Sequence, residues 1–212
     1  FESPISQSLL TKLEIDKFGE KALLIDTRKN AFLVFYRKTR NVMETLRSFE
    51  GSYYSGAITD NSCGVLLTSN SSKIVFYDIL NRQEEHIDLA SSSAERCRVL
   101  HAPNMNNFIF INKRKCSVSL VDDKSFSLLS TIEVKSDTKV RTYAYHPPSK
   151  TLVLGLKNGL VCVVDLVHER VIEEKALIDW EGKSVKIDSL AILDGFVVVS
   201  GANGIVSLFL KL

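Results

Sequence analysis

The stretch that decides the fold is residues 149–166, which reads SKTLVLGLKNGLVCVVDL. Two apolar runs in it are separated by Lys157, Asn158 and Gly159. An Asn-Gly pair between runs rich in β-branched residues is a strong hairpin signal, because a type I′ turn needs positive φ at both central residues. The stretch therefore predicts two antiparallel strands joined by a type I′ turn at Asn158 and Gly159.

The same hairpin shape recurs along the chain. Residues 196–210 read FVVVSGANGIVSLFL, and residues 65–78 read VLLTSNSSKIVFYD. The residues that close the second strand of each hairpin are Arg37, Asp78, Asp122, Asp165 and Leu210, at separations of 41, 44, 43 and 45 residues. This spacing predicts five repeat units, over residues 9–49, 53–89, 96–134, 140–178 and 185–212.

Each unit holds short runs of β-branched or aromatic residues, separated by Gly, Asn, Ser and Lys. No helical spacing of apolar residues persists for three turns. The pattern predicts an all-β fold with four strands in each unit, the fifth unit stopping one strand short.

Four antiparallel strands every 40–45 residues, roughly, resembles the WD-repeat (WD40-like) β-propeller family. The Trp-Asp pair that closes the third strand in that family stands here as Tyr77-Asp78, Val121-Asp122 and Val164-Asp165. The resemblance covers nearly the whole chain and implies a single β-propeller of about five four-stranded blades over residues 1–212. The Gly-His of the family is absent and Asn158 replaces a turn aspartate. Apolar packing must therefore replace the family's buried hydrogen-bond network.

The missing outer strand of the fifth unit bears on how the ring closes. In WD-type propellers an N-terminal segment usually supplies that strand, which removes an open edge. Residues 1–8, FESPISQS, are short and polar, and Pro4 cannot donate a ladder hydrogen bond. We expect upstream propeller sequence or a partner chain to complete a larger ring, such as a seven-bladed one. A complete five-bladed ring is the alternative.

No catalytic motif stands out in the sequence. The chain has no Gly-x-Ser-x-Gly, phosphate-binding Gly-rich loop or His-Glu-x-x-His motif, and no Cys-x-x-Cys pair. We expect buried free thiols in a reducing compartment, with disulfides as the alternative, and solvated histidines, as at His146 and His168 in turns. The chain is therefore predicted to be no enzyme and to have no cofactor, metal or catalytic residue.

The overall charge and hydropathy of the chain say little about its partners. The chain of 212 residues carries 27 Lys plus Arg against 25 Asp plus Glu, which indicates no particular partner. No apolar run approaches the ~20 residues that a transmembrane helix needs. We expect an intracellular protein without a transmembrane segment, with cytoplasm and nucleus both open.

Candidate binding residues lie in turns and in the loops between units. Lys113-Arg114-Lys115 and Lys157 lie in second hairpin turns, and aromatic side chains lie in the loops. In a propeller, these turns and loops emerge on one face. The candidate partner-binding residues are Trp180, Tyr53, Tyr54, Arg114, Lys115 and Lys157. The alternatives are that the charged turns are only solvated and that Trp180 is a core plug between blades.

These features predict a non-catalytic protein–protein interaction scaffold, a WD-repeat-like subunit of a multiprotein complex. One alternative is a platform that contacts nucleic acid, anionic lipid or a phosphopeptide through the basic turns. A hydrolytic propeller enzyme is a further alternative, and it would need carboxylates converging on the central channel.

The two kinds of candidate residue should differ in their effect on binding. Trp180→Ala should weaken the partner at least ~30-fold, because central aromatic anchors dominate binding energy. Lys157→Ala should change the affinity less than ~3-fold, because rim lysines act mostly on the association rate. Affinity and melting temperature should be measured for both. A lower melting temperature with unchanged affinity for Trp180→Ala would identify a core plug.

Overall fold

The computed structural model describes residues 10–37, 42–69, 73–88, 97–134, 137–179, 181–201, 204 and 206–211. At residues 37, 42, 43, 73 and 206–211 only the backbone is described. Trp180, Asn203, residues 38–41 and the N-terminal nine residues lie outside the described part. Within the described part, all elements are β-strands except one 3-10 turn, η1 (Pro103–Met105). The all-β prediction is therefore confirmed.

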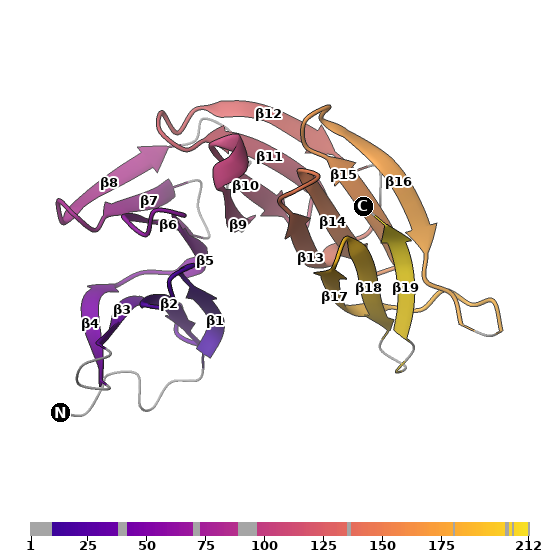
Figure 1. Ribbon diagram of the computed structural model, residues 1–212, viewed down its shortest axis with the longest axis horizontal. Helices are drawn as coiled ribbons and strands as arrows, with labels where there is room; N and C mark the ends of the chain where they lie inside the picture. Colours follow the sequence, from indigo (N-terminus) through magenta and orange to yellow (C-terminus); the bar gives the residue numbers. More distant parts are fainter. Residues whose placement is uncertain are drawn as a thin grey trace. The chain divides into compact units, whose positions relative to one another are not determined.

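The strands form four four-stranded sheets and one three-stranded sheet in the described part of the chain (Figure 1). Strands pair in sequence order, and every pair in the first, second, fourth and fifth sheets is antiparallel. The first sheet contains β1 (Leu10–Ile15), β2 (Lys21–Asp26), β3 (Ala31–Arg37) and β4 (Val42–Phe49). The second contains β5 (Tyr53–Ile58), β6 (Gly64–Ser69), β7 (Lys73–Asp78) and β8 (Gln83–Asp88).

The remaining sheets follow the same order along the chain. The third contains β9 (Cys97–Ala102), β10 (Asn107–Asn112), β11 (Ser117–Asp122) and β12 (Leu128–Glu133). The fourth contains β13 (Val140–His146), β14 (Thr151–Leu156), β15 (Leu160–Asp165) and β16 (Arg170–Ala176). The fifth contains β17 (Ile187–Leu193), β18 (Phe196–Gly201) and β19 (Val206–Lys211). That these sheets are the blades of one ring stays a prediction.

The chain divides into two compact units. The first unit comprises Phe1–Phe110 and Val121–Leu128, and the second comprises residues 111–120 and 129–212. The first two sheets therefore belong to the first unit, and the last two sheets belong to the second.

The hairpin at Gly159 forms as predicted, but its turn type differs. Gly159 has φ +91°, and its N–H donates to the carbonyl of Leu156 at 3.1 Å. Asn158 does not have a positive φ, so the type I′ prediction was wrong. The chain instead makes a turn centred on Lys157 and Asn158, and Gly159 follows as the left-handed residue of a bulge. Gly159 is therefore the residue that follows the two central turn residues, and not the second of them.

Gly159 is constrained by crowding as well as by its φ. A Cβ atom there would lie 2.5 Å from both Ser184 Oγ and the backbone oxygen of Val185, whereas one at Gly204, with φ +83°, would meet nothing within 4 Å. Gly204→Ala should therefore lower the free energy of unfolding by about 1 kcal/mol, from backbone strain alone. Gly159→Ala should cost at least ~1 kcal/mol more. Equal denaturant midpoints for the two variants would contradict this packing.

The recurring aspartates at the ends of the third strands cap turns. In each case Oδ1 accepts two backbone N–H bonds: Leu80 and Asn81 for Asp78, Lys124 and Ser125 for Asp122, and Val167 and His168 for Asp165. These bonds lower the pKa of Asp78 and Asp122. Burial opposes the same effect at Asp165, but hydrogen bonds from His168 outweigh it and the pKa is lowered. The repeated sequence signal therefore has a local structural cause.

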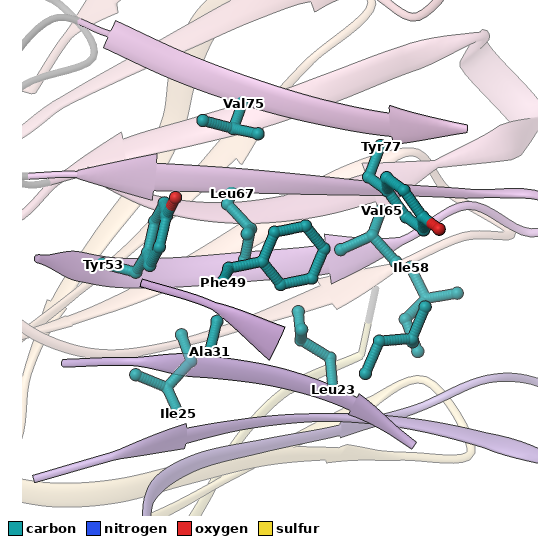
Figure 2. Packing of buried hydrophobic residues seen from close by; sticks show 11 residues of the cluster. Leu23, Ile25, Ala31, Phe49, Tyr53, Ile58, Val65, Leu67, Val75 and Tyr77 are labelled. Atoms are coloured by element: carbon teal, nitrogen blue, oxygen red, sulfur yellow. The ribbon is translucent and has the colours of Figure 1, made fainter. Parts of the chain in front are cut away.

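Between the first and second sheets lies an apolar core with an aromatic centre. The ring of Phe49 lies between those of Tyr53 and Tyr77, with centroids 6.4 and 5.4 Å away and nearly perpendicular planes (Figure 2). Aliphatic side chains of both sheets surround these rings: Leu23, Ile25, Ala31, Leu33, Ile58, Val65, Leu67 and Val75. Sheet-to-sheet packing therefore supplies the apolar core that the sequence predicted.

Apolar packing also joins the fourth and fifth sheets of the second unit. Val153, Val161 and Val163 project from β14 and β15 into a buried cluster with Ile187 and Val197 of the fifth sheet. All six residues of β14 are buried, and so are four of the six in β15. The middle strands of the fourth sheet are thus buried on both faces, as the alternating apolar rows predicted.

A buried carboxylate also links the first two sheets. Asp16, in the β1–β2 loop, is 6% exposed and accepts hydrogen bonds from the N–H groups of Glu20 and Lys21 at 2.8 and 3.0 Å. Ser62 Oγ, in the β5–β6 loop, donates to its other oxygen at 2.7 Å. Burial alone would raise the pKa of Asp16, but these three bonds outweigh it and the pKa is lowered.

Asp16 should therefore stabilise the fold in a pH-dependent way. Asp16→Ala should lower the free energy of unfolding by about 2 kcal/mol at pH 7, because three bonds to a charged group are lost. The contribution of a carboxylate with a lowered pKa is complete above its ordinary pKa and is lost as the pH falls through the folded value. The stability difference between wild type and variant should thus shrink below about pH 4. A pH-independent difference would contradict the assignment, and Asp88→Ala on exposed β8 is the control.

Candidate functional site

The structure separates the predicted partner-binding residues by environment. Trp180 lies outside the described residues, so its role stays a prediction. Tyr53 is only 7% exposed, and its ring packs on Phe49 in the core between the first two sheets. Its ring is therefore a core group and not an exposed anchor. Tyr54 belongs to the first unit, whereas Arg114, Lys115 and Lys157 belong to the second.

Tyr54 lies half-buried among basic side chains. The guanidinium carbon of Arg98 lies 4.8 Å from the centre of the Tyr54 ring, and Lys29 Nζ lies 5.9 Å from it. Lys29 comes from the β2–β3 turn, Tyr54 from β5 and Arg98 from β9. The three residues, called the Tyr54 cluster below, thus bring together groups from three consecutive sheets.

The arginine of the Tyr54 cluster is held in place by two contacts. One guanidinium nitrogen of Arg98 donates to the backbone oxygen of Tyr54 at 2.8 Å, and the guanidinium also lies against the ring. A guanidinium has five N–H donors, so this bond leaves others available. The group is therefore positioned in advance for a carboxylate or phosphate acceptor.

A largely buried lysine lies near Arg98. Lys12 Nζ on β1 donates to Ser55 Oγ at 2.9 Å and to the backbone oxygen of Gly56, and it lies 3.6 Å from Glu14. Burial lowers the pKa of Lys12 to about 8; Glu14 opposes that shift, and the charge of Arg98 lowers the pKa further. Glu14 therefore offsets the charge of Lys12, and Arg98 remains the cation at the start of β9.

The basic turn of the third sheet lies where the sequence placed it. Residues 113–116 connect β10 and β11, and Arg114 and Lys115 are exposed there, while the backbone N–H groups of both donate to Asn112 Oδ1. Lys113 Nζ donates to the backbone oxygen of Arg141 at 2.7 Å. Lys157 is exposed in the β14–β15 turn. These side chains give the second unit a set of solvent-facing cations.

A cavity of about 510 Å³ lies at the other end of β5 and β9, within the first unit. Its walls come from the β5–β6 loop, the end of β7, the end of β9 and the β11–β12 turn. Carboxylates, apolar side chains, a histidine and the half-buried thiol of Cys63 line it. This group of loops is the one that a propeller places on the face opposite to the second hairpin turns.

A histidine–aspartate pair forms part of the cavity wall. The side chain of His101, near the end of β9, is 8% exposed. Its Nδ1 accepts a hydrogen bond from the N–H of Asp60 at 3.0 Å, so Nε2 carries the proton and donates to Asp123 Oδ2 at 3.2 Å. Both ring nitrogens are occupied, and the bond from Asp60 joins the β5–β6 loop of the second sheet to β9 of the third.

Sequence reasoning missed Arg98, Lys12, His101 and Asp123. Arg98 and Lys12 lie on strands, where a single cation looks like a solvated side chain, and His101 ends a strand without any motif. The repeat period could have indicated these contacts, because the bonded residues lie about one repeat apart in the sequence. Tyr54 and Arg98 are 44 residues apart, Lys12 and Ser55 are 43 apart, and Asp60 and His101 are 41 apart.

The cysteines are the remaining chemically reactive side chains considered, and they are free thiols. All four cysteines are free thiols, and burial followed by the charge of Glu174 raises the pKa of Cys116 to about 11 and of Cys162 to about 12. No group of three or more His, Cys, Asp or Glu side chains in the described ranges is arranged to hold a metal ion.

A search of the same ranges finds no helix long and apolar enough to cross a membrane.

Comparison with known proteins gives a likeness in fold. No family model and no curated protein matches the sequence. A solved structure of hydrazine synthase from Kuenenia stuttgartiensis is similar, with a TM-score of 0.70 and 14% sequence identity. The alignment covers 89% of this chain and 54% of that chain, so this chain spans about half of its length. At this identity the likeness shows the fold alone, a β-propeller-like all-β architecture.

Proposed function

We propose that the chain is a non-catalytic interaction scaffold, a WD-repeat-like propeller module that binds another protein subunit within a larger assembly. The Tyr54 cluster carries this proposal. Arg98 is fixed by the backbone oxygen of Tyr54 and by the Tyr54 ring, and Lys29 lies beside the same ring. Tyrosine and arginine are the residue types that most often anchor protein interfaces.

The charge of the cluster favours a partner segment with carboxylates. Arg98 can donate two parallel bonds to a carboxylate, and Lys29 raises the local positive potential. Because Arg98 is already held in place, little side-chain entropy is lost on binding. The cluster therefore fits an acidic stretch of a protein partner that lies along the start of β5 and β9.

A second candidate function is a platform for nucleic acid, anionic lipid or a phosphopeptide. The observation that favours it is the exposed basic turn at Arg114 and Lys115, together with Lys157. Binding of this kind depends steeply on salt, because it releases counterions from the polyanion. The Tyr54 cluster favours the protein partner, since it combines an aromatic ring with a positioned guanidinium.

Quantitative co-purification from cells tests the proposal. Tyr54→Ala and Arg98→Ala should each lower the yield of partner polypeptides at least ~10-fold, because anchor residues cost about 2 kcal/mol or more when truncated. Arg170→Ala, an exposed arginine on β16, is the matched control and should leave the yield unchanged. Melting temperatures should be compared to confirm that the variants fold.

Three outcomes would contradict the proposed function. One is that no polypeptide co-purifies with the wild-type protein, and another is that the Arg98 and Arg170 variants behave alike. The third is that charge reversal at Arg114 and Lys115 abolishes a salt-sensitive interaction while Arg98→Ala has no effect. That last result would favour the polyanion platform.

A further inference from the structure

Hydrogen bonds connect Lys12 on β1 to the two strands that carry the Tyr54 cluster. Its Nζ donates to Ser55 Oγ at 2.9 Å, and the same oxygen accepts a bond from the N–H of Val99 at 3.2 Å. Ser55 follows Tyr54 in β5, and Val99 follows Arg98 in β9. Lys12 therefore lies where β1, β5 and β9 are joined, next to the positioned guanidinium.

The surroundings of Lys12 make its charge costly. Its pairing partner on β2 is Ile25, which is fully buried in the core between the first two sheets, and the Lys12 side chain is only 12% exposed. From β5 it meets a hydroxyl and a backbone carbonyl, which are uncharged. Charged groups act on it from two sides: Glu14 on its own strand, 3.6 Å away, and Arg98 on β9.

Lys12 therefore changes its charge close to neutral pH. Burial lowers its pKa from 10.5 to about 8; Glu14 opposes this shift, and Arg98 adds to it. Carboxylates and guanidinium groups keep their charges throughout this range. Lys12, Glu14 and Arg98 together thus carry a net positive charge while Lys12 is protonated and none once it is neutral. A neutral amine still has two N–H donors for its bonds to β5, so the change is mainly one of charge.

We propose that the proton on Lys12 controls how strongly the Tyr54 cluster binds an acidic segment. This inference rests on the function proposed for that cluster. While Lys12 is charged, it offsets Glu14, and Arg98 offers its remaining donors to the carboxylates of the partner. Once Lys12 is neutral, the unbalanced charge of Glu14 repels those carboxylates, so binding weakens as the pH rises. By linkage, a bound acidic segment makes the Lys12 proton harder to remove.

An NMR titration of the full chain with the blocked peptide acetyl-Gly-Glu-Glu-Gly-amide, at pH 7 and pH 9, tests this dependence. The peptide carboxylates do not titrate between these pH values. The peptide should bind saturably at pH 7 and shift the ring signals of Tyr54, and its affinity should fall at least about threefold at pH 9. Equal affinities at the two pH values would overturn this inference alone. No saturable binding at pH 7 would overturn the proposed function and this inference with it.

Three variants assign the pH dependence to Lys12. Lys12→Met is uncharged at every pH, so it should bind at least about threefold more weakly than wild type at pH 7 and lose little more at pH 9. Lys12→Arg keeps its charge and should bind equally at both pH values. Lys17→Met removes a charge from the exposed β1–β2 loop of the same unit and should behave as wild type. A fall in affinity for Lys12→Met as large as that of wild type would overturn the assignment.

Direct titration of the lysine side chain decides the question without any variant. In a chain labelled with carbon-13 at lysine Cε, the Lys12 signal should titrate near pH 8. Saturation with the glutamate peptide should raise the midpoint by at least about half a pH unit, which is the threefold change in affinity seen from the other side of the linkage. The glutamine counterpart of the peptide, at the same concentration, should leave the midpoint unchanged. A midpoint that the glutamate peptide does not move would overturn the proposal.

Discussion

Burial of the middle strands on both faces is the constraint on which the whole structure depends. β10 and β14 are buried along their entire length, whereas the outer strands β8, β12 and β16 are mostly exposed. A sheet of this kind cannot be stable alone, because the apolar side chains of its middle strands need a second sheet on each face. Stacking of the first sheet on the second, and of the fourth on the fifth, follows from this pattern, and the Phe49 cluster between the first two sheets shows how it is achieved.

Stacking also determines where polar chemistry can occur. Side chains on the faces of the middle strands are committed to packing, so charged groups gather at strand ends, in turns and on the outer strands of the sheets. The Tyr54 cluster and the cavity at His101 both arise there, at opposite ends of β5 and β9. The carboxylates that line the cavity include Asp78, whose other task is to cap its own turn. Asp78 therefore both caps a turn and lines the cavity.

A few hydrogen bonds join neighbouring sheets, and each connects residues that lie about one repeat apart in the sequence. Ser62 donates to Asp16, Lys12 donates to Ser55, and Arg98 donates to the backbone oxygen of Tyr54. Each bond joins a loop or first strand of one sheet to the corresponding part of the next. Such bonds fix the lateral position of one sheet on the next, which apolar packing alone specifies loosely, because hydrogen bonds are directional.

The sequence by itself determined the strands, the repeat of about 43 residues and the hairpin glycine at position 159. These features are local, since alternation, turn chemistry and capping aspartates act within a few residues. The turn type was missed because the same Asn-Gly pair also suits a turn followed by a bulge. Only the tertiary structure buried Tyr53 and His101 and brought Arg98 to Tyr54. Those contacts depend on how far one sheet slides along the next, and that is decided by the fit of side chains more than 40 residues apart.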